Sequence, residues 1–166
     1  MRLIPFVLAA GLALAAAGPL AAQGTEVPFG AFKHDSSLPV ELSADRLMVD
    51  QGDGTAVFSG NVTIGQGDMR ITAGEVRVTY AADGDATGNI ERLEATGGVT
   101  LVSGAEAAEA REALYTIETG VIVMTGDVLM TQGRNALSAG KLTVNLEQGT
   151  GLLEGGVRTI LQTGSN

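Results

Sequence analysis

FSGNVTI, at Phe58–Ile64, is one of four similar stretches that decide how this chain folds. The other three are ATGGVTL at Ala95–Leu101, MTGDVLM at Met124–Met130 and EGGVRTI at Glu154–Ile160. Each contains a glycine followed two positions later by a valine. The recurrence of one short pattern along a chain of 166 residues indicates an internal repeat within a single domain.

Three sets of markers show that the repeat is regular. The glycines of the four stretches are Gly60, Gly97, Gly126 and Gly155, so the second step along the chain equals the third and the first is longer by eight. A set of alanines lies before them, and its members are Ala44, Ala73, Ala110 and Ala139. The third set consists of Gly67, Gly104 and Gly133. Both further sets show the same short and long steps. We therefore predict a repeat with a period of about 29 residues, interrupted by one insertion in the loop AADGDATGNI.

Within each unit the apolar residues alternate with polar ones. Phe58, Val62 and Ile64 fall on one face of the first stretch, while Ser59 and Thr63 fall on the other. Strict alternation is typical of half-buried strands, and turn signals such as QGDG, GQGD, TQGR and EQGTG separate the runs. The segment 104–113 has helical propensity, but it occupies a position that the repeat assigns to strands. We therefore predict an all-β chain of many short antiparallel strands, with 104–113 as a strand and Glu106, Glu109 and Glu112 on an exposed face.

Glycine inside a strand marks a bend, a bulge or a close approach to the backbone. Two interpretations of the four glycines stay open. In the first, they form a line of missing side chains along a trough inside a curved, open double sheet. In the second, they lie at turns or bulges around an ordinary packed interior.

The N-terminus has the layout of a secretory signal peptide. Arg2 precedes an uncharged run from Leu3 to Ala22, and Ala21-Ala22 provides the small residues of a cleavage site. We expect residues 1–22 to be removed, 23–37 to be a flexible segment, 38–162 to form the domain and 163–166 to be a tail. The alternative is an uncleaved membrane anchor, because the run is just long enough to span a bilayer. Cleavage leaves 10 − 1 = 9 basic against 19 acidic residues, a net charge of −10, which disfavours nucleic acid as a partner.

Catalytic and metal-binding patterns are absent from the sequence. There is no cysteine, and the one histidine, His34, precedes the first expected strand without a second base or nucleophile beside it. Asp83 and Asp85 lack the ligand number and the distal glutamate of a calcium loop. We therefore expect no enzyme, no metal and no cofactor.

The stretch GNVTIGQGDMRITA, at Gly60–Ala73, resembles the LptA/OstA-like family of periplasmic lipopolysaccharide-transport proteins. The preceding SADRLMVDQGDGTAVFSGNV, at Ser43–Val62, looks like the opening of that family's domain, and the resemblance covers about Leu38 to Ile160. It implies a twisted β-jellyroll, open at both ends, whose interior shelters the acyl chains of lipid A. It also implies a periplasmic bridge of head-to-tail jellyrolls between an inner-membrane lipopolysaccharide-export complex and an outer-membrane translocon. The acidic charge and the Ala/Glu-rich segment 104–113 depart from what is typical of the family.

Under this resemblance, the inward apolar residues of the strands become candidate lipid contacts, although each is also consistent with simple core packing. The candidates are Phe58, Val62, Ile64, Val76, Val78, Leu93, Val99, Ile117, Ile122, Met124, Val128, Met130, Leu142 and Val144. The end strands, 40–50 and 151–162, would offer unpaired edges to partners, unless the termini fold over and cap them.

Other functions remain open at this point. The chain could be a membrane-anchored relative of the same fold that receives lipid from an extractor. It could also be a structural β-repeat protein with a packed interior and no ligand. An enzyme such as a polysaccharide lyase is disfavoured, because no acid–base cluster is present.

Overall fold

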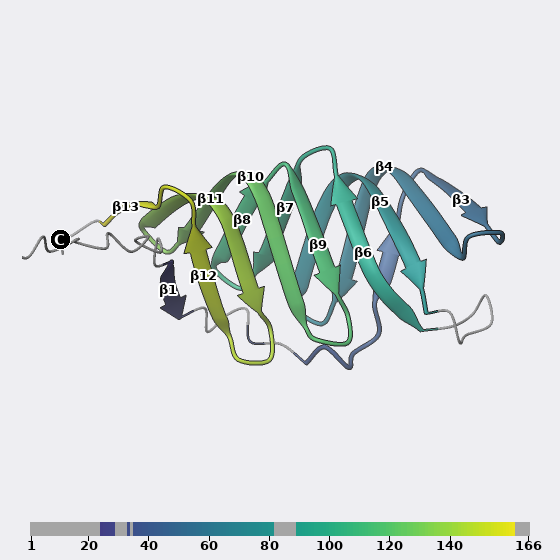
Figure 1. Cartoon of the computed structure of the whole chain (residues 1–166), viewed down its shortest axis with the longest axis horizontal. Helices are drawn as coiled ribbons and strands as arrows, with labels where there is room; N and C mark the ends of the chain where they lie inside the picture. Colours follow the sequence, from purple (N-terminus) through teal and green to yellow (C-terminus); the bar gives the residue numbers. More distant parts are fainter. Residues whose placement is uncertain (1–23, 29–32, 34, 82–88, 162–166) are drawn as a thin grey trace, which may run out of the picture.

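The computed structural model describes residues 24–28, 33, 35–81 and 89–161. This part of the chain contains thirteen strands and no helix, which confirms the predicted all-β class (Figure 1). The strands are β1 Thr25–Pro28, β2 Glu41–Ser43, β3 Arg46–Asp50, β4 Thr55–Gln66, β5 Met69–Tyr80, β6 Ile90–Thr96, β7 Val99–Ser103, β8 Glu106–Ala110, β9 Glu112–Thr116, β10 Val121–Gln132, β11 Asn135–Asn145, β12 Thr150–Glu154 and β13 Arg158–Ile160. All pairings between these strands are antiparallel, as expected.

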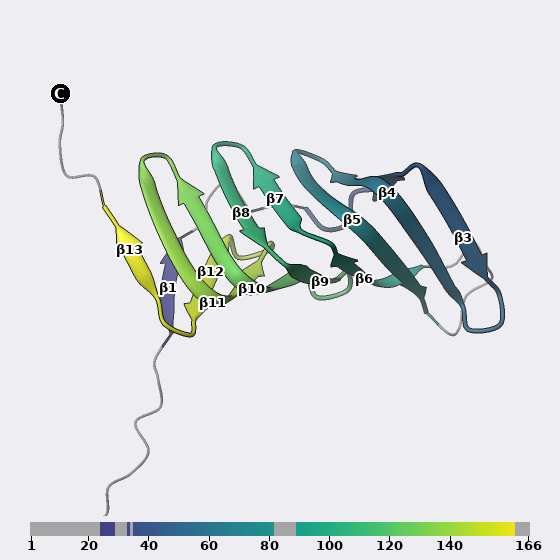
Figure 2. The same ribbon diagram turned by 90° about the horizontal axis from the view of Figure 1, so that it is seen from above.

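The strands form one continuous sheet folded into two layers. Layer A runs in the order β2, β4, β5, β7, β8, β10, β11, β13. Layer B runs in the order β3, β4, β5, β6, β9, β10, β11, β12, β1. The four long strands β4, β5, β10 and β11 belong to both layers because each bends at its middle. The strands stack along the long axis of the molecule, with β3 at one end and β1 and β13 at the other (Figures 1 and 2).

The four repeated glycines lie where the chain passes from one layer to the other. Gly60, Gly97, Gly126 and Gly155 all have positive φ, from 80° to 85°. The residue after each is also left-handed, and these residues are Asn61, Gly98, Asp127 and Gly156. The pairing register of β4 with β5 shifts between Ser59 and Val62, and that of β10 with β11 shifts between Thr125 and Val128. The glycines are therefore bulges and turns at the fold between layers, and the interpretation of them as a line of missing side chains in the interior was wrong.

The residue that follows each repeated alanine packs against one of these glycines. A Cβ added to Gly97 would lie 3.2 Å from the Cα of Gly74, and one added to Gly155 would lie 3.3 Å from the Cα of Gly140. At the other two bends a pair of polar side chains stands where these two bends have two glycines in contact. Asn61 donates a 2.8 Å hydrogen bond to Asp45, and Arg111 forms an ion pair with Asp127. The repeated alanine and the repeated glycine thus mark the two chain segments that pack against each other at each bend.

The segment with helical propensity forms strands, as the repeat predicted. β8 and β9 follow one another through a bend at Arg111, whose N–H donates to the carbonyl oxygen of Gly126 at 3.0 Å. The expected exposed face of glutamates was wrong at one position, because Glu106 is 7% exposed and points into the interior at the start of β8. Strand alternation explains this, since Glu106 shares its face with the buried Ala108.

Several expectations concern residues at the edge of the described part or beyond it. The signal peptide, His34, the tail 163–166 and both Asp83 and Asp85 lie outside the described residues. Within the range 23–37, which we expected to be flexible, Thr25–Pro28 forms β1 and pairs with β12. The N-terminus therefore caps the edge of β12, which is one of the two arrangements left open for the end strands. No helix in the described ranges is long and apolar enough to span a membrane.

Candidate functional site

The space between the two layers is apolar and enclosed. Twelve of the fourteen predicted lining residues are at most 2% exposed, and the two others, Phe58 and Ile117, are partly buried. The twelve are Val62, Ile64, Val76, Val78, Leu93, Val99, Ile122, Met124, Val128, Met130, Leu142 and Val144. All fourteen belong to, or pack against, one continuous apolar cluster that extends from β4 to β12. In this state these side chains are shielded from solvent by one another and by their neighbours.

The composition of this interior suits a flexible aliphatic ligand. Its members are mainly valine, leucine, isoleucine, alanine and methionine. Aliphatic contacts are non-directional, and methionine adapts its shape to irregular neighbours. Such an interior can repack around a chain that slides, at a smaller cost than an aromatic core with fixed ring geometry.

The two layers meet along the bends on one side and leave a second boundary, the mouth, on the other. Three hairpin tips of layer A lie along the mouth, at residues 66–69, 103–106 and 132–135. The turns of layer B, at residues 116–121 and 145–150, face them. In Figure 1 the turns that join β9 to β10 and β11 to β12 lie at the lower edge of the molecule, which is the side of the mouth.

Inward-facing polar side chains line the layer A side of the mouth. Gln66 is 1% exposed, Ser103 is 3% exposed and Glu106 is 7% exposed. Tyr115 of layer B donates a 2.7 Å hydrogen bond from its hydroxyl to Oε1 of Gln66. Burial raises the pKa of Tyr115 to about 12, so the phenol is neutral under ordinary conditions.

Gln132 and Glu106 form a second polar contact further along the mouth. Gln132 Nε2 donates to Glu106 Oε1 at 2.6 Å. The other oxygen of Glu106, Oε2, is buried without a hydrogen-bond partner. A buried carboxylate oxygen is costly to leave unpaired, and among the buried side-chain polar atoms of the described residues this is the one without a partner.

Sequence reasoning missed these polar residues because it searched for apolar alternation. A signal was nevertheless present, because the step along the chain from Gln66 to Gln132 equals the step from Gly60 to Gly126. The same glutamine thus recurs at the same place in two repeat units, in the turns GQGD and TQGR. A repeated amide at a hairpin tip, buried at Gln66 and partly buried at Gln132, can donate hydrogen bonds to a backbone segment beside it.

The ends of the molecule expose apolar side chains. On β3, Leu47, Met48 and Val49 are 53%, 65% and 56% exposed. At the opposite end, Ile160 and Leu161 are 68% and 62% exposed. Leu47 and Val49 are the cross-strand partners of Phe58 and Ala56, so they continue the apolar face of the core onto β3, the edge strand of layer B at this end.

Acid–base and metal chemistry find no support in the described ranges. No group of three or more His, Cys, Asp or Glu residues in them is placed to hold a metal ion. Tyr115, whose pKa burial raises to about 12, lies inside the apolar core rather than in an open cleft. The arrangement is that of one twisted antiparallel sheet whose two layers enclose an interior of apolar side chains.

Comparisons with known proteins agree with this class. Residues 41–150 match the family model described as LptA/(LptD N-terminal domain) LPS transport protein. An uncharacterized protein of Rhizobium meliloti (strain 1021) is 30% identical over 149 residues, which cover 87% of this chain and 80% of that protein. The chain therefore belongs to the LptA/LptD N-terminal domain family of lipopolysaccharide-transport proteins.

The fold is also found in a solved structure. LptH of Pseudomonas aeruginosa, described as the LptA-homologous periplasmic component of its lipopolysaccharide transport device, is similar with a TM-score of 0.67. The match covers 77% of this chain and 98% of LptH, at 16% sequence identity. It shows that this chain has the LptA-like β-jellyroll fold, as the sequence predicted.

Proposed function

We propose that this chain is a periplasmic carrier that holds the acyl chains of lipopolysaccharide between its two layers and passes them toward the outer membrane. The observation that carries the proposal is the continuous aliphatic cluster between the layers, in a chain that belongs to this transport family. Neither feature alone would suffice, because an apolar core is common to all folded domains.

The energetics of the ligand support an enclosed route. Each methylene group of an acyl chain gains about 0.8 kcal/mol when it leaves water, so a dozen contribute about 10 kcal/mol. A lipid with several such chains needs continuous shielding while it crosses an aqueous compartment. The absence of charged groups among the fourteen predicted lining residues suits a ligand that must also leave again.

Photo-crosslinking tests this role directly. A photoreactive residue at Met124 or Val144, which point into the interior, should crosslink to lipopolysaccharide in cells. The matched control is Leu129, which lies on the same strand as Met124 but on the outer face and is 43% exposed. Crosslinks at the interior positions and none at Leu129 are expected. Crosslinks at neither, with the protein folded, would refute the carrier role.

The exposed ends support a bridge built from several jellyrolls. We propose that the β3 end and the β13 end join head to tail, with an inner-membrane export complex at one end of the row and an outer-membrane translocon at the other. Edge strands with exposed apolar residues favour the addition of another strand. Depletion of the protein should then leave lipopolysaccharide at the inner membrane, and normal surface delivery after depletion would contradict the bridge.

Two alternatives differ in measurable ways. A membrane-anchored receiver of the same fold would retain residues 1–22, so N-terminal sequencing of the exported protein separates it from a free carrier. A structural β-repeat protein would bind no lipid, so a binding assay on the purified mature chain separates it from both.

A further inference from the structure

Described residues of the N-terminal segment lie along the mouth of the jellyroll. We use the name strap for the described residues 24–28 and 35–40. The strap starts in layer B, where β1 pairs with β12 at one end of the molecule. It leads into β2, which pairs with β4 in layer A at the other end. In Figure 1 residues 35–40 run along the lower edge of the strands, which is the side of the mouth.

At its middle, the strap lies between the two layers. The side-chain amide of Gln66, at a tip of layer A, donates to the carbonyl oxygens of Ser36 at 2.9 Å and Leu38 at 2.8 Å. On the opposite side, Gly120 in a turn of layer B approaches Ser36. A Cβ added to Gly120 would lie 3.6 Å from the Cβ of Ser36. Ser36 therefore touches both sides of the mouth.

The repeat provides a second amide for the strap. Gln132, the counterpart of Gln66, donates from Nε2 to the carbonyl oxygen of Pro28 at 3.0 Å. Two equivalent glutamines thus hold three backbone carbonyls of a segment whose described residues, apart from β1, have no strand partner. At Ser36 and Leu38, the side-chain amide of Gln66 replaces the ladder hydrogen bonds that this backbone lacks.

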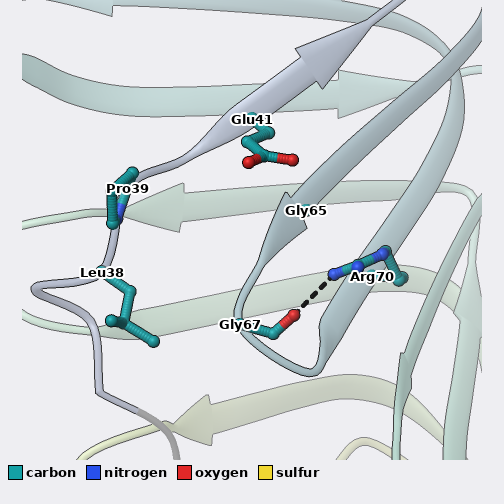
Figure 3. Close-up of a pocket in the computed structure, with 6 residues that line it drawn as sticks. All are labelled: Leu38, Pro39, Glu41, Gly65, Gly67 and Arg70. Atoms are coloured by element: carbon teal, nitrogen blue, oxygen red, sulfur yellow. Dashed lines mark hydrogen bonds between the residues drawn. The ribbon is translucent and has the colours of Figure 1, made fainter.

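The strap is held weakly compared with the core beneath it. None of its described residues is buried, and Leu38 is 40% exposed. Cavities lie on both sides of Leu38. One, of about 250 Å³, separates it from the β4–β5 tip near Gly65, Gly67 and Arg70 (Figure 3). The other, of about 690 Å³, is lined by residues 36–38 and Val40 of the strap and by the rim of layer B, which includes Ile117.

We propose that the strap and an acylated lipid compete for the mouth, so that a lipid enters the interior only when the strap leaves Gln66 and Gln132. The amide groups that now donate to strap carbonyls have the chemistry to donate to the ester or amide carbonyls at the root of acyl chains. Glu106 Oε2, buried beside Gln132 without a donor, would accept from a hydroxyl or N–H group of the same ligand. This inference rests on the proposed carrier function and adds the route of access and its competitor.

A reversible covalent lock tests the competition. The substitutions Ser36→Cys and Gly120→Cys would place two Cβ atoms about 3.6 Å apart, within the range of disulfides. The chain has no other cysteine, so only this bond can form. The probe is the methyl ester of cis-parinaric acid, a fluorescent acyl ester, with purified lipopolysaccharide as the second ligand. The oxidised double variant should bind both at least tenfold more weakly than the same protein after reduction.

The controls separate the lock from its side effects. Both single cysteine variants are measured with and without reductant. Gly120→Cys reports any strain at position 120, where φ is +60°, and Ser36→Cys reports any effect of a thiol at position 36. Equal binding by the oxidised and reduced double variant would overturn the inference and leave the carrier function intact, because lipid would then enter elsewhere. No binding by the unaltered protein would instead refute the carrier function itself.

Hydrogen exchange gives a second test that needs no substitution. On addition of lipopolysaccharide to the unaltered chain, backbone amides of residues 35–40 should exchange faster, while those of β10 and β11 should not. Slower exchange in residues 35–40 would overturn the inference, because the strap would then cover the bound lipid instead of yielding its place.

Discussion

The hydroxyl of Tyr115 in layer B lies 2.7 Å from Oε1 of Gln66 in layer A, and this hydrogen bond joins the two layers across the interior. The nitrogen of the same Gln66 amide holds the carbonyls of Ser36 and Leu38. One buried glutamine therefore connects layer A, layer B and the strap. Any event that parts the layers must break this contact, which makes it a natural place to measure how firmly the interior is closed.

Replacement of Tyr115 by phenylalanine should destabilise the protein by about 1–3 kcal/mol, because it leaves the buried Oε1 of Gln66 without its donor. Urea unfolding followed by circular dichroism measures this change. Tyr80→Phe is the matched control, since Tyr80 is only partly buried and, unlike Tyr115, is not the hydrogen-bond partner of Gln66. A loss for Tyr115→Phe no larger than that for Tyr80→Phe would contradict the prediction.

The stability of the protein should also depend on alkaline pH through Tyr115. Its pKa of about 12 in the folded state lies above the value of about 10 expected in the unfolded chain. The folded state therefore binds the phenol proton more tightly, and this contribution is fully present below pH 10. It is lost as the pH rises from 10 to 12, at about 1.4 kcal/mol per pH unit.

The chain contains two tyrosines, so Tyr80→Phe leaves Tyr115 as the only phenol. In that variant, tyrosinate absorbance should rise with a midpoint near pH 12 while the protein is folded. The loss of stability above pH 10 should be smaller in Tyr115→Phe than in the unaltered chain. A midpoint near pH 10 in folded protein would show that the phenol is not enclosed.

Gly126→Ala should destabilise the fold more than Gly133→Ala. Both glycines have positive φ, +85° and +59°, so each substitution carries a backbone cost of about 1 kcal/mol or more. Only at Gly126 would the new Cβ also collide, 2.8 Å from the Cβ of Arg111, whereas nothing lies within 4 Å at Gly133. The difference between the two unfolding free energies isolates the close approach at the bend. Equal losses would show that the bend tolerates a side chain.

Charges at the β3 end should prevent self-association. The double substitution of Leu47→Lys and Val49→Lys places two charges where the apolar face of the core continues onto the edge strand β3. We expect the unaltered chain to grow in mass with concentration in light scattering, and the double variant to remain a monomer. Leu129→Lys, on the outer face away from the ends, is the control and should associate normally. Unchanged association of the double variant would exclude this end from the contact.

Much of the architecture could be predicted because it is local. A period of two along 55–64 determines which side chains of β4 point inward, since successive residues of a strand face opposite sides. The repeat then extended that assignment to β8 and β9 against their helical propensity, because equivalent positions in a repeat pack against equivalent neighbours. The twelve enclosed members of the predicted lining set follow from the same rule.

The role of the glycines could not be read in the same way. Alternation places Gly60 on the inward face, yet the left-handed pair Gly60-Asn61 interrupts the alternation and turns the chain into the other layer. That outcome depends on Asp45, which approaches from the bend between β2 and β3. The burial of Glu106 likewise depends on Gln132, which is 26 residues away in the sequence.

The sequence by itself thus determined the class of fold, the repeat and the inward apolar residues, because periodicity and spacing are properties of neighbours along the chain. Only the tertiary structure decided where the layers bend, which polar groups lie buried at the mouth, and that the N-terminal strap lies along it. These features arise from contacts between Gln66, Ser36 and Tyr115, whose separations of 30 and 49 residues leave no local pattern. Close packing of distant segments, rather than propensity, determines whether the interior is open or closed.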